Sequence, residues 1–103
     1  MKIVWSPLAL DQVAEAFASI GAERPFSAQE WLEELIDKAS SLALFPEMGR
    51  MVPEAERPAL RELLVGNHRL IYRRDEAEVV ILAVHHVRRD LRSRELGPSV
   101  EGA

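Results

Sequence analysis

The segment Glu78 to Leu91 constrains the fold most, because a short apolar run is followed at once by a basic cluster. Six consecutive apolar residues extend from Val79 to Val84, and four of them are β-branched. Such a run predicts a strand buried on both faces of a sheet. It is too short to cross a membrane, which takes roughly 20 apolar residues. The residues that follow are mostly basic: His85, His86, Arg88, Arg89, Asp90 and Arg92. We therefore expect function at this edge of the domain.

The length of 103 residues predicts a single domain, which we place at residues 1–96, followed by a disordered tail at 97–103. A hydrophobic content of 48% with 29% charged residues is typical of a soluble globular protein. There is no cysteine, which fits a reducing compartment. The first residues lack the apolar core of a signal peptide. We expect a cytoplasmic protein that does not bind a membrane.

The net charge of −4 hides an asymmetry between the two halves of the chain. Residues 1–49 carry 3 basic and 8 acidic side chains, whereas residues 57–94 carry 9 and 5. All nine of those basic residues are arginine, whose planar fork suits phosphate and carboxylate partners. A solvated basic face explains the charge equally well.

The start of the chain predicts a strand and then a helix. Residues 2–5 form a short strand-like run. Ser6 and Pro7 then supply an N-cap and a proline for the first helical position. Apolar residues spaced by three and four predict a helix over about 7–20, ended by Gly21.

A second helix is predicted by a start signal of two parts. Ser27 and Glu30 have the spacing of a capping box, and Phe26 and Trp31 have that of a hydrophobic staple. The apolar stripe continues to about residue 44. The short link between the two helices predicts an antiparallel hairpin whose apolar stripes, with both tryptophans, pack in the core.

The second half of the chain has the pattern of a β-meander. Residues 46–58 contain three prolines and a glycine, which predicts an irregular connection. Strands are expected at 60–65 and 68–74, joined by the Gly66-Asn67 turn, before the apolar strand. The predicted class is α+β with the order β-α-α-β-β-β, the helical hairpin packing on one face of a mainly antiparallel sheet. The apolar strand should lie near its middle.

Alternation along the strand 68–74 places Arg69 and Arg73 on one face. A face with two arginines is the less suitable core, so we expect it to be the open side of the sheet. Arg88 and Arg89 could join them there and form a concave cationic surface for an anionic partner. That partner could be a nucleic-acid backbone or an acidic protein segment.

The histidines do not predict a metal site. His85 and His86 are neighbours on an extended stretch, so their rings point to opposite faces, and no other cluster has ligand spacing. Each could simply be a hydrogen-bonded residue at a strand end. There is no phosphate-binding loop, nucleophile elbow or carboxylate pair, and we expect no cofactor. If the protein cleaves anything, metal-free phosphodiester cleavage by arginine and histidine is the credible chemistry.

The order of elements and the motifs together resemble the RelE/ParE superfamily of toxins from type II toxin–antitoxin systems, known also as plasmid stabilisation proteins. The resemblance extends from Lys2 to about Leu91. It rests on short motifs in a fixed order: Leu44-Phe45-Pro46, Gly49-Arg50, Pro53-Glu54, Arg61-Glu62-Leu63, Arg69 to Arg73, and Val84 to Asp90.

The resemblance leaves two activities open. RelE-like members are ribosome-dependent messenger RNA endonucleases (mRNA interferases), and here their catalytic residues would be Arg69, His86 and Arg89. However, the positions of two lysines that they use fall on Leu60 and Glu62. ParE-like members inhibit DNA gyrase without that set, and the GR-PE segment is more similar to theirs. We therefore favour a ParE-like toxin, which would have no catalytic residues, over an enzyme.

Both activities imply partners. A cognate antitoxin would fold an extended or helical acidic segment onto the toxin in a hetero-oligomer, and the target would be DNA gyrase or the ribosome with its mRNA. The side chains expected to contact the target are all basic: Arg61, Arg69, Arg73, His86, Arg88 and Arg89. A toxin-like domain that has lost its activity and serves only as a binding module is a third possibility.

Overall fold

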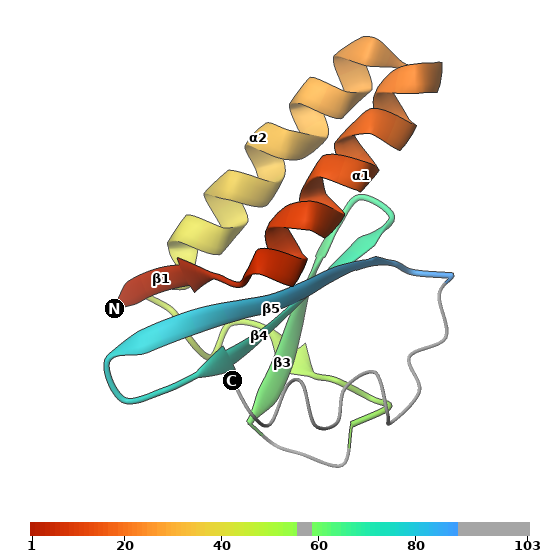
Figure 1. Cartoon of the computed structure of the whole chain (residues 1–103). Helices are drawn as coiled ribbons and strands as arrows, with labels where there is room; N and C mark the ends of the chain where they lie inside the picture. Colours follow the sequence, from red (N-terminus) through yellow and green to blue (C-terminus); the bar gives the residue numbers. More distant parts are fainter. Residues whose placement is uncertain (56–58, 89–103) are drawn as a thin grey trace.

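Two helices lie on one face of a five-stranded sheet in a computed structural model of the chain (Figure 1). The structure describes residues 1–55 and 59–88, so Arg89 and the expected tail at 97–103 lie outside the described residues. The elements follow one another as β1 (Lys2–Trp5), α1 (Pro7–Glu23), α2 (Pro25–Ser41), β2 (Arg50–Met51), β3 (Leu60–Val65), β4 (His68–Arg74) and β5 (Glu78–His86). The predicted α+β class and the order of its helices and main strands are confirmed. Within the described residues, neither helix is long and apolar enough to span a membrane.

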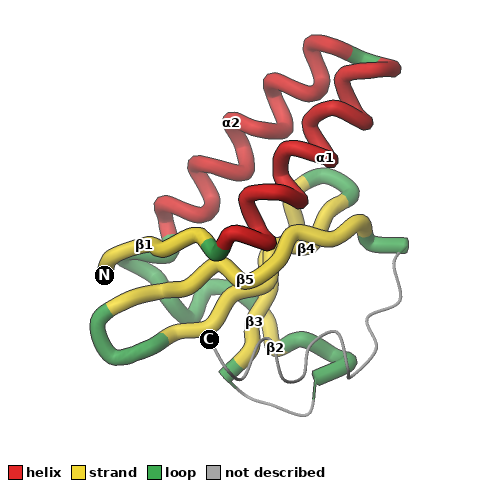
Figure 2. Tube along the Cα trace, viewed as in Figure 1, coloured by secondary structure: helices red, strands yellow, loops and turns green. Residues whose placement is uncertain are grey.

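The strands are arranged in the order β1-β5-β4-β3-β2. β1 pairs with β5 in parallel, and the other neighbouring strands pair antiparallel. β5 therefore has a partner on each side, as predicted for the apolar run (Figure 2). Its residues from Val79 to His85 are all buried, which accounts for the unbroken apolar composition.

Helix α1 is longer than the sequence pattern predicts. It begins as expected, with the Ser6 hydroxyl accepting a hydrogen bond from the Ala9 backbone N–H at 3.0 Å. The predicted end at Gly21 is wrong, because the helix continues to Glu23. Glycine costs a helix only about 1 kcal/mol, and the Arg24 N–H still reaches the Ile20 carbonyl at 2.8 Å.

Helix α2 begins earlier than predicted. Pro25 takes the first helical position, and Arg24 precedes it without a side-chain capping bond. Proline is suited to that position because its fixed φ matches the helix and its missing N–H has no partner to lose. Ser27 consequently lies inside the helix, and Phe26 is 84% exposed. The capping box and the hydrophobic staple are both wrong, as is the predicted end near residue 44, since the helix ends at Ser41.

The β3–β4 hairpin has the predicted boundaries. Gly66 adopts a φ of +58° in the turn, a conformation that L side chains rarely adopt. The Trp31 indole N–H donates to the Val65 carbonyl at 3.1 Å and ties α2 to this turn. The two-residue strand β2 lies in the connection that the sequence predicted to be irregular.

Both faces of the sheet carry a buried cluster. The larger one lies between the helices and the sheet and includes Trp31, Leu35, Leu42, Tyr72 and Ile81. It confirms the predicted packing of the helical hairpin, although Trp5 is only half-buried. The smaller one, on the opposite face, consists of Val52, Leu60, Ile71, Val80, Leu82 and Ala83. The expectation that this face is open is therefore wrong.

Candidate functional site

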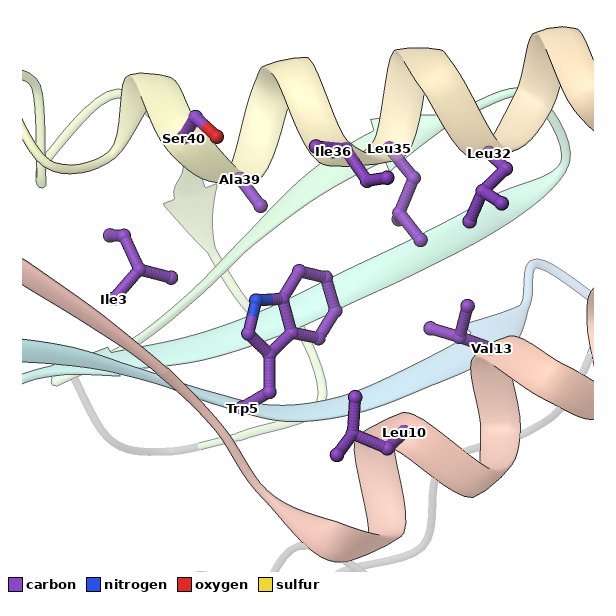
Figure 3. Close-up of a pocket in the computed structure, with 9 residues that line it drawn as sticks. All are labelled: Ile3, Trp5, Leu10, Val13, Leu32, Leu35, Ile36, Ala39 and Ser40. Carbon is purple, nitrogen blue, oxygen red and sulfur yellow. The ribbon is translucent and has the colours of Figure 1, made fainter.

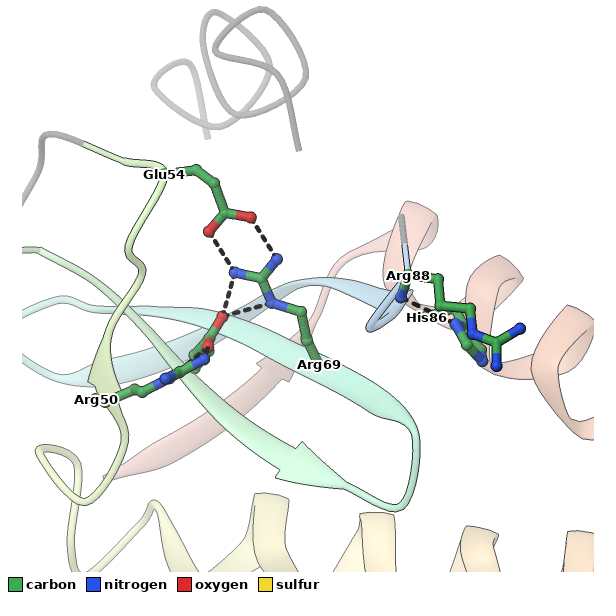
Figure 4. A network of polar contacts seen from close by, with 6 residues as sticks. Arg50, Glu54, Arg69, His86 and Arg88 are labelled. Atoms are coloured by element: carbon green, nitrogen blue, oxygen red, sulfur yellow. Dashed lines mark hydrogen bonds and ion pairs between the residues drawn. The ribbon is translucent and has the colours of Figure 1, made fainter. Parts of the chain in front are cut away.

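Arg69 of β4 lies on the sheet face opposite the helices, as alternation predicts, but it is buried. Only 6% of the residue is exposed. Its Nη1 and Nη2 atoms bind the two carboxylate oxygens of Glu54 at 2.6 and 2.7 Å, and its Nε atom binds Glu62 Oε1 at 2.7 Å. A fourth contact joins Nη2 to the same Glu62 oxygen at 2.6 Å. The planar fork of the guanidinium is thus occupied by two carboxylates (Figure 4).

Glu62 is the centre of this network and comes from β3. It is 1% exposed. The pairing of β2 with β3 places Arg50 directly opposite Glu62, and the Arg50 Nε atom donates to Glu62 Oε2 at 2.6 Å. Cross-strand neighbours on one face of a sheet are close enough for such contacts. The arginine network, defined as Arg50, Glu54, Glu62 and Arg69, therefore holds the irregular connection against the sheet.

The arginine network is electrically balanced, with two positive and two negative side chains. Hydrogen bonds from Arg69 are the largest cause that lowers the pKa of Glu54 below its usual value. The same contact, together with Glu62, raises the pKa of Arg69 despite its burial. Burying an unpaired charge is costly, and pairing in this geometry removes that cost. An external phosphate would have to compete with the Glu54 and Glu62 carboxylates for the Arg69 guanidinium.

The structure does not assemble the expected cationic surface. Arg73 shares its face with Arg69, but its Nε atom binds Asp75 Oδ1 at 3.0 Å. Arg88 is exposed at the end of β5, apart from the arginine network (Figure 4). Arg89 is not among the described residues. The predicted surface would have been cationic. That prediction is wrong for Arg69 and Arg73, because carboxylates from nearby segments neutralise both side chains.

The remaining predicted contact residues lie in two places. Arg61 of β3 donates to the Gly49 carbonyl at 2.8 Å and supports the connection before β2. His86 is exposed, and its Nδ1 atom accepts a hydrogen bond from the Arg88 backbone N–H at 3.0 Å. His86 and Arg88 thus form a small basic end of the sheet. The His68 ring packs beside it, with its centroid 5.2 Å from that of the His86 ring.

The three histidines line a polar cavity of about 710 Å³ between the helical hairpin and the ends of β4 and β5. Burial, with a smaller effect of His86, lowers the pKa of His68 and so favours its neutral form. His85 is buried with its Nδ1 atom 3.4 Å from the Gln12 amide nitrogen. Among the described residues, no three histidine or acidic side chains are placed to hold a metal ion.

Sequence reasoning missed Glu54 and Glu62 as partners of Arg69. A signal was present for Glu62, since it shares a strand face with Leu60, and a carboxylate is expected to need a basic partner when buried. No periodic pattern identifies Glu54, because it lies in an irregular segment.

Comparisons with known proteins agree with this fold. A family model described as "ParE toxin of type II toxin-antitoxin system, parDE" matches residues 3–91. Among solved structures, a chain titled "Chromosomal ParDE TA system from P. aeruginosa" superposes with a TM-score of 0.70 at 18% sequence identity, covering 84% of this chain and 95% of that chain. At this identity the superposition shows a shared fold. No match was found among curated proteins.

Proposed function

The chain belongs to the ParE toxin family of type II toxin–antitoxin systems, and from this premise we propose that it stops growth by inhibiting DNA gyrase in the cytoplasm. A cognate antitoxin neutralises it by binding in a hetero-oligomer. The family implies the antitoxin partner. The choice of gyrase over RNA as the target rests on the ion pairs that Arg69 makes with carboxylates.

The observation that carries the choice is the occupied guanidinium of Arg69. A nuclease that stabilises a phosphate transition state needs cations aimed at the developing charge. Arg69 instead makes four contacts of 2.6 to 2.7 Å with Glu54 and Glu62. The two positions where RelE-like toxins carry lysines hold Leu60, 2% exposed, and the buried Glu62. These features favour inhibition by binding over cleavage of RNA.

We assign target contact to the basic end of the sheet. His86 and Arg88 are exposed there, whereas Arg69 and Arg73 are held by carboxylates. Arg61 is also turned inward, toward the Gly49 carbonyl. In this proposal Arg69 and Arg61 maintain the fold, and the exposed basic residues meet the target.

Expression of the chain without its antitoxin tests the function. We expect growth arrest with loss of DNA supercoiling, while messenger RNA stays intact. Arg88→Ala should weaken gyrase inhibition several-fold, whereas the matched exposed change Arg24→Ala at the helical turn should not. Ribosome-dependent cleavage of messenger RNA with normal supercoiling would show the nuclease activity instead. Unaffected growth would indicate a domain that only binds.

A further inference from the structure

A local hydrogen bond holds the backbone of Arg88 at the end of β5. His86 is the final residue of the strand, and its Nδ1 atom accepts a hydrogen bond from the Arg88 backbone N–H at 3.0 Å (Figure 4). The bond reaches the second residue along the chain, as in the turns that asparagine and aspartate side chains form with their own backbone. The Val87 N–H between them donates to the Asn67 carbonyl at 2.8 Å. The position of Arg88 therefore depends on the His86 ring.

This hydrogen bond also defines the charge of the His86 ring. A backbone N–H can only donate, so Nδ1 must offer a lone pair, and the proton of the neutral ring lies on Nε2. When the ring is protonated, the added proton occupies Nδ1, which then has no lone pair to accept with. The charged ring cannot make this bond. Arg88 is therefore held only while His86 is neutral.

The orientation of the His86 ring is supported by its neighbour on the next strand. His68 of β4 pairs with His86 in the register of the sheet. The two rings meet edge to face, with centroids 5.2 Å apart and planes inclined by 79°. The Trp31 ring lies 5.0 Å from that of His68. Aromatic rings favour such tilted contacts, so the ring that carries Nδ1 is supported from α2 through His68.

His68 is poorly placed to carry a charge. Among the described residues, no group forms a hydrogen bond with its buried Nδ1 atom. A proton at this atom would be buried without an acceptor, which is costly. Burial accordingly lowers the pKa of His68, with a smaller effect of His86. Two charged imidazoles in contact would also repel each other, so this pair of histidines packs best when both rings are neutral.

The charged groups around the two rings have both signs. The polar cavity that the rings line is also lined by Glu15 and Glu23 of α1, Arg24 and the buried His85, and Arg88 follows β5. The two carboxylates favour protonation of the rings, whereas the arginines oppose it. These carboxylates and arginines are exposed, so solvent and salt weaken their effects. The hydrogen bond at Nδ1 is the contact that protonation abolishes outright.

We infer that His86 is a positioning residue for Arg88 and acts in its neutral form, not as a cation that contacts the target. The Nδ1 atom holds the Arg88 backbone, so that the guanidinium is presented at one place beside the sheet. Protonation breaks this hydrogen bond and releases Arg88. Gyrase inhibition should therefore weaken in mild acid, whereas a cationic His86 would strengthen contact with an anionic target. The inference rests on the proposed function, because that function assigns target contact to this end of the sheet.

Nuclear magnetic resonance of the full chain tests the hydrogen bond without gyrase. The nitrogen shifts of the ring report its tautomer, and hydrogen exchange reports protection of the Arg88 amide. At about pH 8, where an imidazole is mostly neutral, we expect the proton on Nε2. The Arg88 amide should exchange about three- to tenfold more slowly than in His86→Ala at the same pH. A proton on Nδ1, or equal exchange rates, would overturn the inference.

Two substitutions separate the position of the acceptor from its charge. The side-chain oxygen of asparagine lies close to the place of Nδ1 and bonds the second N–H along the chain, whereas the longer glutamine side chain carries its oxygen farther out. His86→Ala and His86→Gln should each weaken inhibition of supercoiling about three- to tenfold. His86→Asn should recover most of the inhibition that His86→Ala loses. Equal losses in the asparagine and glutamine variants would contradict the positioning role.

The pH profile decides between the neutral and the charged form of His86. Inhibition is measured between about pH 8 and about pH 6, where imidazoles change charge, and is normalised to gyrase alone at each pH. The wild type should need several-fold more protein in acid, and His86→Asn should lose most of this dependence. Wild-type inhibition that strengthens in acid would overturn the inference. A wild type that never inhibits gyrase would refute the proposed function, while exchange of the Arg88 amide would still decide whether neutral His86 holds it.

Discussion

The arginine network differs in composition from the apolar groove that Ile3 and Trp5 of β1 form with Leu10, Leu32 and Ile36 of the helical hairpin (Figure 3). In the network, every carboxylate has an arginine partner within 2.7 Å, and the centre of the network is buried. The groove is lined by apolar side chains instead, and two of them, Leu10 and Ile36, are about half exposed. Paired charges hold the fold together in the first region, whereas the second region leaves apolar side chains exposed.

The largest expected effect comes from removing one charge from the network. Arg69→Met leaves Glu62, which is 1% exposed, with Arg50 as its remaining partner. Losing one partner of a buried ion pair costs about 3–5 kcal/mol of unfolding free energy. Urea denaturation followed by circular dichroism measures the loss. Arg74→Met is the control, because the Arg74–Glu47 pair is exposed and contributes at most about 1 kcal/mol. Equal losses in the two variants would show that burial does not distinguish them.

Two glycines give the next largest effect, with opposite signs. A Cβ at Gly49 would lie 2.6 Å from the Glu62 carbonyl oxygen and 2.7 Å from the Tyr72 hydroxyl. Gly49→Ala should therefore destabilise the protein by about 1–3 kcal/mol through overpacking. At Gly21 the nearest atom would be Ala28 Cβ at 3.5 Å, an ordinary contact in a helix. Gly21→Ala should stabilise by about 0.4–1 kcal/mol. Thermal unfolding compares them, and a stabilised Gly49→Ala would refute the close packing.

A smaller effect should appear only in acid. The folded-state pKa of Glu54 is lowered below its ordinary value of 4.5, chiefly by hydrogen bonds from Arg69. Its stabilising contribution is therefore complete above about pH 4.5 and is lost as the pH falls through the lowered value. Glu54→Gln should reduce stability near neutral pH and converge with the wild type once the pH falls below the lowered pKa of Glu54. His68, whose pKa burial also lowers, is present in both proteins, so its effect cancels in the comparison. A stability difference that stays constant with pH would contradict the pairing.

The smallest effect on stability belongs to the groove. Ile36 and Leu10 are about half exposed, and substitutions at exposed positions usually change stability by no more than about 0.5 kcal/mol. Ile36→Gln should leave the midpoint of thermal unfolding almost unchanged. A large loss of stability would mean that Ile36 contributes to the core despite its exposure.

Several elements could be predicted because local chemistry specified them. The Gly66-Asn67 turn fixed the β3–β4 hairpin, and the apolar run identified β5 as an interior strand. The start of α2 was missed because Pro25 competes with the capping box, and β2 has only two residues, too few for a pattern.

The site was harder to predict than the fold. Alternation placed Arg69 on the correct face, but its burial depends on Glu54, which reaches it from an irregular segment 15 residues away. The groove also eluded prediction, because its apolar residues have the spacing of core positions. Only the separation of α1 and α2 beside β1 leaves Leu10 and Ile36 uncovered. Contacts between distant segments determine both features, and periodicity carries no information about them.

The central claim is that the arginine network maintains the fold and takes no part in inhibition. Replacing a buried ion network by apolar residues of similar size is often neutral for stability, so the triple variant Arg69→Met, Glu62→Leu and Glu54→Gln should fold. The decisive measurement is gyrase supercoiling in the presence of this variant, with its fold confirmed by circular dichroism. We predict inhibition equal to that of the wild type. A folded variant that no longer inhibits supercoiling would contradict the account.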